Sequence, residues 1–253
     1  MDLIQALAAE LGKDPRHVEN VVHLLDEGNT IPFIARYRKE LHGAMDDTSL
    51  RTLEERLQYL RGLEERREAV KKSIDEQGKL TDELTAAIDS AKTLAEVEDL
   101  YRPYKQKRRT RATMAKEKGL EPLAALLFAQ ERDCPRPEEA ARDFVDPEKG
   151  VETVEDALQG ASDIIAEQIS DDAAIRKSLR ALISRQGQLV SRAATEDDSV
   201  YRLYYDFTQS VARLQGHQVL AINRGEKEGI LKVSITLDRE QALPLLRRAV
   251  VKP

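Results

Sequence analysis

The helical organisation of this chain is clearest in residues 93–124, TLAEVEDLYRPYKQKRRTRATMAKEKGLEPLA. Thr93 and Glu96 have the spacing of a capping box, in which a hydroxyl and a carboxylate bond to free amides of the first helical turn. The apolar residues that follow recur at three- and four-residue spacing, which predicts a short helix with one apolar side: Leu94, Val97, Leu100 and Tyr101. Pro103 ends this helix because proline lacks an amide hydrogen and disfavours helical geometry in the residue before it.

A basic segment, residues 102–118, follows this helix. It contains eight basic residues and one acid, Glu117, a formal charge of +7 in a chain whose formal net charge is −6. Positive charge is therefore concentrated here, which indicates an anionic partner. Guanidinium groups match phosphate oxygens, and Tyr101 and Tyr104 can stack on unpaired bases. We predict nucleic-acid binding by Arg102, Tyr104, Lys105, Lys107, Arg108, Arg109, Arg111 and Lys116.

Two other interpretations of the basic segment stay open at this point. It is a solvated loop in the first, and in the second its arginines pair with acidic faces of neighbouring helices. Exposure separates these possibilities, because nucleic-acid binding needs free side chains whereas a structural role needs them held against carboxylates.

The composition is typical of a mainly α-helical protein. The chain has 253 residues, of which 41% are hydrophobic, 34% charged and only 4% aromatic, with no tryptophan. Its single cysteine, Cys134, excludes an internal disulfide, and no apolar run approaches the roughly 20 residues of a membrane helix. The first residues lack the pattern of a signal peptide, so we expect a cytoplasmic location and no membrane partner.

The first 40 residues predict three short helices joined by tight turns. This arrangement resembles a helix-turn-helix, in which the last helix presents a basic face to a DNA groove. Secondary candidates for nucleic-acid binding are therefore Arg36, Arg38 and Lys39. The alternative is ordinary core packing with a solvated basic face.

A long helix is predicted over residues 48–77, with Asp47 as its cap. Its outer face is expected to hold charges of mixed sign, including Glu64 and Arg67. The same two residues interrupt a coiled-coil pattern, which favours packing within a globular array. Further helices are expected up to Gly187.

The pattern changes after residue 188. Residues 201–207, YRLYYDF, alternate as in a strand but fit a helix face equally well, and we expect an extended or mixed segment there. Residues 217–226 predict a helix, and ILKVSITLD, residues 230–238, alternates as a β-strand should. This strand has no obvious partner in the sequence, so we expect an incomplete β element. The predicted domains are a helical domain over residues 1–190 and the start of a truncated mixed segment over residues 191–253.

The sequence offers no pattern for catalysis or metal binding. The four histidines are scattered, a lone cysteine cannot make a zinc site, and Gly225 and Gly229 do not form a phosphate-binding loop. Carboxylates such as Glu98 and Asp99, placed before a basic loop, are more typical of ion pairing than of acid–base chemistry. We expect no enzyme activity, no metal and no cofactor.

Six separated blocks resemble the Tex family of bacterial transcription accessory proteins. They are TIPFIARYRKE (30–40), ERLQYLRGLEERR (55–67), EQGKLTDEL (76–84), DLYRPYKQKRRTRA (99–112), KGLEPLA (118–124) and VLAINRGEKEG (219–229). The resemblance covers nearly the whole chain. It implies the helical N-terminal region, with a helix-turn-helix-like part, of a longer protein whose RNase H-like, helix-hairpin-helix and OB-fold RNA-binding parts have no counterpart here.

The resemblance leads to two functional expectations. The first is a contribution to nucleic-acid binding in transcription, to RNA or DNA, through the basic segment. The alternative is an α-helical scaffold for contacts with other domains or with RNA polymerase, without nucleic-acid binding of its own.

Overall fold

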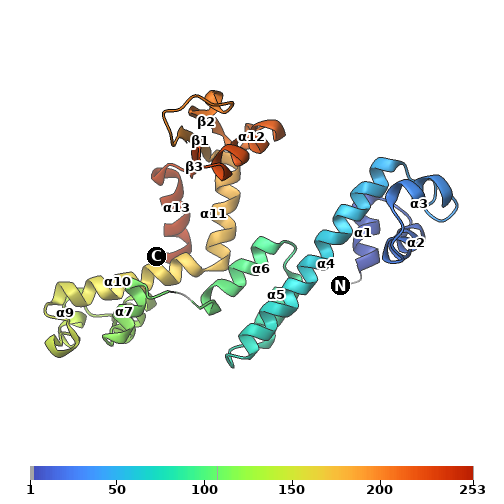
Figure 1. The fold of residues 1–253 in the computed structure, drawn as a ribbon. Coiled ribbons are helices and arrows are strands. Elements are labelled where there is room, and N and C mark those ends of the chain that lie inside the picture. The colour runs from blue at the N-terminus through green and yellow to red at the C-terminus, as the bar shows by residue number, and fades with distance from the viewer. Residues whose placement is uncertain (1–2, 107, 253) are drawn as a thin grey trace. The chain divides into compact units, whose positions relative to one another are not determined.

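The computed structural model describes residues 3–106 and 108–252, and it divides into two compact units, residues 1–104 and 105–253 (Figure 1). Thirteen α-helices, four short 3-10 helices and one small antiparallel sheet make up the regular structure of the described residues. The predicted fold class, mainly α with a small β element near the C-terminus, is confirmed.

The first unit is built around its longest helix, α4 (Asp47–Asp75). Three short helices pack together with it: α1 (Leu3–Leu11), α2 (Pro15–Asp26) and α3 (Ile31–Tyr37). The cap of α4 is Asp46, whose carboxylate accepts a hydrogen bond from the Ser49 amide at 2.8 Å, so the predicted cap at Asp47 is wrong by one residue. An apolar stripe along α4 forms the core of the unit with Leu50, Leu53, Leu57, Leu60, Leu63, Val70 and Ile74.

The second half of α4 packs with α5 (Asp82–Ser90) and α6 (Leu94–Tyr101). Arg67 lies within this packing and is only 3% exposed, so its predicted place on the outer face is wrong. Its guanidinium donates hydrogen bonds to the Ala91 carbonyl, after α5, and to the Glu64 carboxylate at 2.7 Å. An arginine therefore occupies a position in the apolar stripe because two acceptors meet it there.

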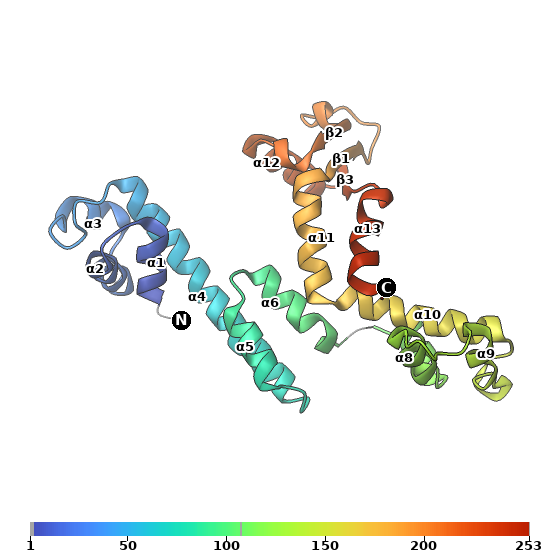
Figure 2. The ribbon, with the colours of Figure 1, turned by 180° about the vertical axis from the view of Figure 1, so that it is seen from behind.

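The second unit has its own core around α10 (Val154–Asp171). Three shorter helices pack on α10: α7 (Arg111–Glu117), α8 (Glu121–Ala129) and α9 (Pro137–Arg142) (Figure 2). Helix α8, whose sequence is apolar almost throughout, buries Leu123 and Ala124 but leaves Leu126 and Phe128 partly exposed.

The rest of the second unit combines three helices with a three-stranded sheet. Its elements are α11 (Ala173–Gln186), β1 (Gln188–Ala193), β2 (Asp206–Ser210), α12 (Gly216–Lys227), β3 (Leu231–Thr236) and α13 (Arg239–Val250). The strand order is β2-β1-β3, and both pairs are antiparallel, with Val190 of β1 opposite Thr208 of β2 and Ser234 of β3.

The expectation that the strand near residue 230 lacks a partner is wrong, because β3 pairs with β1 along its whole length. The predicted helix at 217–226 corresponds to α12 and is confirmed. The domain boundary predicted near residue 190 falls inside β1. Among the residues that the structure describes, no helix is long and apolar enough to cross a membrane.

Candidate nucleic-acid interface

The basic segment begins at the end of α6, in a 3-10 turn, Arg102–Tyr104, at the edge of the first unit. Thr93 caps α6 as predicted, accepting a hydrogen bond from the Glu96 amide at 3.2 Å, while the Glu96 carboxylate accepts from the Lys92 amide at 2.7 Å. The 3-10 turn is fixed to the turn that follows α4, because the Gln77 side chain donates a hydrogen bond to the Tyr104 carbonyl at 3.0 Å.

Both tyrosines of this region make packing contacts within the first unit. Tyr101 and Tyr104 pack against the core of the first unit, and the Tyr101 hydroxyl lies 3.0 Å from the Ser73 hydroxyl. The Arg66 guanidinium lies over the Tyr101 ring, 5.4 Å from its centre. Tyr104 is half-buried, so only part of its ring is open to a base.

Three cationic side chains at the start of the basic segment are exposed: Arg102, Lys105 and Arg108. Neither Lys105 nor Arg108 has a carboxylate partner among the residues that the structure describes. Lys107, also predicted to bind nucleic acid, lies outside the described residues. The geometry therefore leaves Lys105 and Arg108 open to an anion in water.

The next two arginines are exposed but lie near carboxylates. Arg109 pairs with Glu117 at 2.8 Å while 68% of its side chain remains exposed. Arg111 is 80% exposed, and its Nε lies 3.9 Å from the Asp163 carboxylate on α10. Both pairs are accessible to solvent, so each is worth at most about 1 kcal/mol and can open when a phosphate competes.

Helix α7 holds the far end of the basic segment against α10. Thr110 caps α7 by accepting a hydrogen bond from the Thr113 amide at 3.1 Å. The two helices approach closely at Gly160, where an added Cβ would lie 3.3 Å from the Cβ of Ala115. Lys116, on the outer side of α7, pairs with Glu121 at 3.0 Å and is 41% exposed.

The secondary candidates lie in the first unit, at the end of α3. Arg36 and Lys39 are exposed, and Arg38 is half-buried with its guanidinium 5.2 Å from the centre of the Phe33 ring. The neighbouring Tyr37 is 56% exposed. This end of α3 therefore offers cations beside an accessible aromatic ring, which is a combination that suits nucleic acid.

A further basic surface, on α11 and α13, was not predicted from the sequence. Helix α11 carries four basic residues and no acid, and α13 carries three basic residues and one acid. Within the described part of the chain, Arg185 and Arg248 make no ion pair. The absence of acids from α11 is the signal that could have identified this surface. No group of three or more His, Cys, Asp or Glu residues in the described part of the chain could hold a metal ion.

Comparisons with known proteins agree on one family. A model of the Tex-like protein N-terminal domain matches residues 1–75, and a Tex central region-like model matches residues 133–250. The uncharacterized protein YdcI of Bacillus subtilis is 46% identical over 254 residues, which cover 99% of this chain and 35% of that protein. Protein YhgF of Escherichia coli is 47% identical, over 92% of this chain and 30% of its own length.

A third relative has a functional name. The transcriptional accessory protein Tex of Neisseria gonorrhoeae is 43% identical over 93% of this chain and 31% of its own length. The chain thus spans about a third of the length of these curated relatives. The two matched regions and the identities along nearly the entire chain establish that it belongs to the Tex family.

Proposed function

We propose that this chain contributes to nucleic-acid binding in transcription through its basic segment. The observation that carries the proposal is the exposure of Lys105 and Arg108, neither of which has a carboxylate partner among the described residues. Cationic side chains in water bind phosphate by releasing condensed counterions, which requires no specific base. The name of the gonococcal relative supports the transcriptional role.

The arrangement favours sequence-independent contact with single strands. Lys105 and Arg108 lie outside helices and strands, whereas reading base edges in a duplex requires a helix or a ribbon placed in a groove. Tyr104 offers one partly open ring for stacking. No catalytic step is part of this proposal.

The alternative is an α-helical scaffold that contacts other domains or RNA polymerase and does not bind nucleic acid by itself. It is favoured by the ion pairs at the far end of the basic segment, such as Arg109 with Glu117. These pairs are exposed and weak, so they are compatible with either function. A direct binding measurement is therefore needed to separate them.

The test is fluorescence anisotropy of the chain with labelled single-stranded RNA, single-stranded DNA and duplex DNA over a series of salt concentrations. We expect single-strand affinity to fall as salt rises, because each phosphate contact contributes about 0.7 to the slope of log K against log salt. The double variant Lys105→Ala/Arg108→Ala should reduce that slope by about 1.4 and lower the affinity for all three nucleic acids.

A matched control removes one lysine and one arginine from elsewhere in the second unit. In Lys227→Ala/Arg132→Ala both residues are exposed and neither forms an ion pair within the described residues. This variant should bind like the wild-type chain. Absence of binding at low salt, or equal losses in the two double variants, would support the scaffold instead.

The same experiment tests the basic residues at the end of α3 as a separate site. If the helix-turn-helix-like part contacts DNA, then Arg36→Ala/Lys39→Ala should weaken binding to the duplex and leave single strands unchanged. An effect of the same size on all three ligands would instead assign these residues to general phosphate contact.

A further inference from the structure

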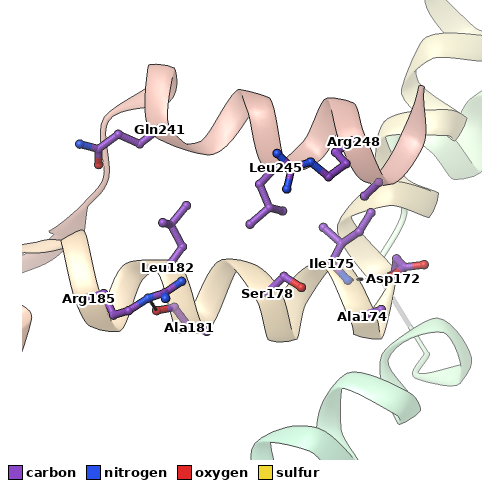
Figure 3. A pocket seen from close by; sticks show the side chains of 11 residues that line it. Asp172, Ala174, Ile175, Ser178, Ala181, Leu182, Arg185, Gln241, Leu245 and Arg248 are labelled. Carbon is purple, nitrogen blue, oxygen red and sulfur yellow. Dashed lines mark hydrogen bonds between the residues drawn. The ribbon is translucent and has the colours of Figure 1, made fainter. Parts of the chain in front are cut away.

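An open groove separates α11 from α13 in the second unit (Figure 3). The two helices lie side by side in both overall views, and the space between them has a volume of about 650 Å³ (Figures 1 and 2). Ile175 and Leu182 of α11, each 8% exposed, and half-buried Leu245 of α13 point into this space. Its floor is therefore apolar.

The apolar side of α13 is only partly covered. Its apolar residues recur at helical spacing, as in a helix that packs against another: Ala242, Leu245, Leu246 and Ala249. None of the residues of α13 is buried: Ala242, Leu245 and Leu246 are half-buried and Ala249 is exposed. Apolar surface left in water at this spacing indicates that a further element packs here.

Helix α13 is nevertheless fixed at both ends. Asp238 caps its start by accepting a hydrogen bond from the Glu240 amide at 3.0 Å. At its far end the Gln130 side chain donates a hydrogen bond to the Val250 carbonyl at 2.9 Å and accepts one from the Lys252 amide at 3.0 Å. The groove is therefore a built feature between two anchored helices.

The rim of the groove is positive. Arg185 lies toward one end and Arg248 toward the other (Figure 3). The Arg185 Nε donates only to the Ala181 carbonyl of its own helix, at 3.3 Å, and neither arginine has a carboxylate partner among the described residues. One acid, Asp172, also lines the groove, but its carboxylate caps α11 by accepting a hydrogen bond from the Ile175 amide at 2.8 Å, so the two arginines outnumber it.

The floor also allows another backbone to approach closely. Ala174, Ser178 and Ala181 are small and lie on one side of α11 at spacings of four and three residues. Between Ala174 and Arg185 the groove follows α11 for roughly 16 Å, because a helix rises about 1.5 Å per residue. This length fits about three turns of a bound helix.

We infer that the groove between α11 and α13 binds an amphipathic helix of a partner protein, with acidic residues flanking its apolar stripe. The apolar floor takes the stripe, and the arginines of the rim take the carboxylates. Charge complementarity selects this occupant, since a basic helix would be repelled. Nucleic acid fits less well, because phosphates and sugars do not cover the apolar surface of Ile175, Leu182 and Leu245.

The test uses a synthetic helical peptide of about four turns, with leucines at helical spacing and flanking glutamates, labelled for fluorescence anisotropy. Two control peptides accompany it: one with the same composition in scrambled order, and one with lysine in place of glutamate. We expect the acidic peptide to bind the chain, and the scrambled and lysine peptides to bind about tenfold more weakly or less.

Reversing the charge of the rim tests the same contact from the other side. Arg185→Glu/Arg248→Glu should lose about tenfold or more in affinity for the acidic peptide and gain affinity for the lysine peptide. The gain shows that the variant is folded. The matched control Arg213→Glu/Arg224→Glu, with the same change of charge elsewhere in the second unit, should leave both affinities unchanged.

Four results would overturn the inference. The first is no peptide binding at about 100 μM. The second is a homodimer that the Arg185→Glu/Arg248→Glu variant dissociates, because a second copy would then fill the groove. The third is RNA binding that this variant abolishes while no peptide binds. The fourth is loss of peptide binding in a longer form of the protein, because its own additional residues would then cover the groove.

Discussion

The buried guanidinium of Arg67 makes a sharp prediction about what stabilises the first unit. Arg67→Ala removes the hydrogen bond to the Ala91 carbonyl, a loss of about 1–3 kcal/mol for a buried acceptor. It also leaves the space of the aliphatic stem empty, which adds about 1–2 kcal/mol. Glu64 is 47% exposed and returns to water at little cost. The free energy of unfolding should therefore fall by about 3 kcal/mol.

Two further variants separate the causes of this loss. Arg67→Met keeps the stem packed and removes a charge from the interior, so its unfolding free energy should fall by only about 1 kcal/mol. Arg61→Ala, on the same helix, breaks a bidentate ion pair with Asp26. The pair is accessible to solvent, and its two hydrogen bonds measure 2.7 and 2.8 Å. That variant should lose less than about 1 kcal/mol.

The assay is thermal unfolding. Hydrogen exchange of the amides of α4, α5 and α6 reports on the first unit. A unit of this size loses about 4–8 °C in Tm for each kcal/mol, so Arg67→Ala should lower its Tm by roughly 12–24 °C. If Arg67→Ala costs no more than Arg61→Ala, the guanidinium does not stabilise the packing. If Arg67→Met costs as much as Arg67→Ala, the hydrogen bond and not the stem carries the whole effect.

Gly43 has a φ of +59°, and an added Cβ would lie 2.4 Å from the Cδ2 of His17, so Gly43→Ala should cost about 2–4 kcal/mol in thermal unfolding. Gly28→Ala, at φ +84° with open space around it, should cost only about 1 kcal/mol; equal costs would contradict the clash. The hydrogen bond from Arg56 lowers the pKa of Glu10, so this pair stabilises the folded chain at neutral pH and ceases to do so as the pH falls through the folded pKa. Glu10→Gln should therefore be less stable than wild type at pH 7, by less than about 1 kcal/mol, and the difference should shrink as the pH falls through the lowered folded pKa; a difference that persists after Glu10 is protonated would exclude this pair as its cause.

Local sequence patterns predicted most of the helices because their determinants lie within a few residues. The apolar residues of α4 from Leu50 to Ile74 that are buried recur at helical spacing in the sequence. Thr93 caps α6, and Thr153 forms a capping box with Asp156 at the start of α10. Arg67 was misplaced because its acceptor, the Ala91 carbonyl, lies 24 residues away, a distance over which residue spacing carries no information.

The β element was harder to predict because strand pairing is not local. Strand β1 is short, and its apolar residues do not alternate in the sequence, because the buried position 191 is a serine and the half-buried position 190 is a valine. Its place between β2 and β3 becomes visible only when residues 206–210 and 231–236 are brought beside it. Helix α13 is missing from the sequence-based predictions, and it contains Pro244, which disfavours a helix interior.

The candidate site shows the same division between local and distant causes. The number of cations in residues 102–118 was evident from the sequence, but their partners were not. Glu117 lies close enough to Arg109 to be guessed, whereas Asp163 reaches Arg111 only because α7 packs on α10. The exposure of Lys105 and Arg108 therefore had to come from the structure.

The two basic surfaces of the second unit differ in what surrounds the charge, and this difference is the reason for proposing different partners for them. Lys105 and Arg108 lie in an irregular, solvated segment with no apolar floor, so attraction for phosphate is the main interaction that they offer. Arg185 and Arg248 flank an apolar groove between anchored helices, so their charge can only orient a ligand that also buries apolar surface. Because both surfaces are positive, net charge alone cannot distinguish them, and the apolar floor is the feature that separates a phosphate site from a helix-binding groove.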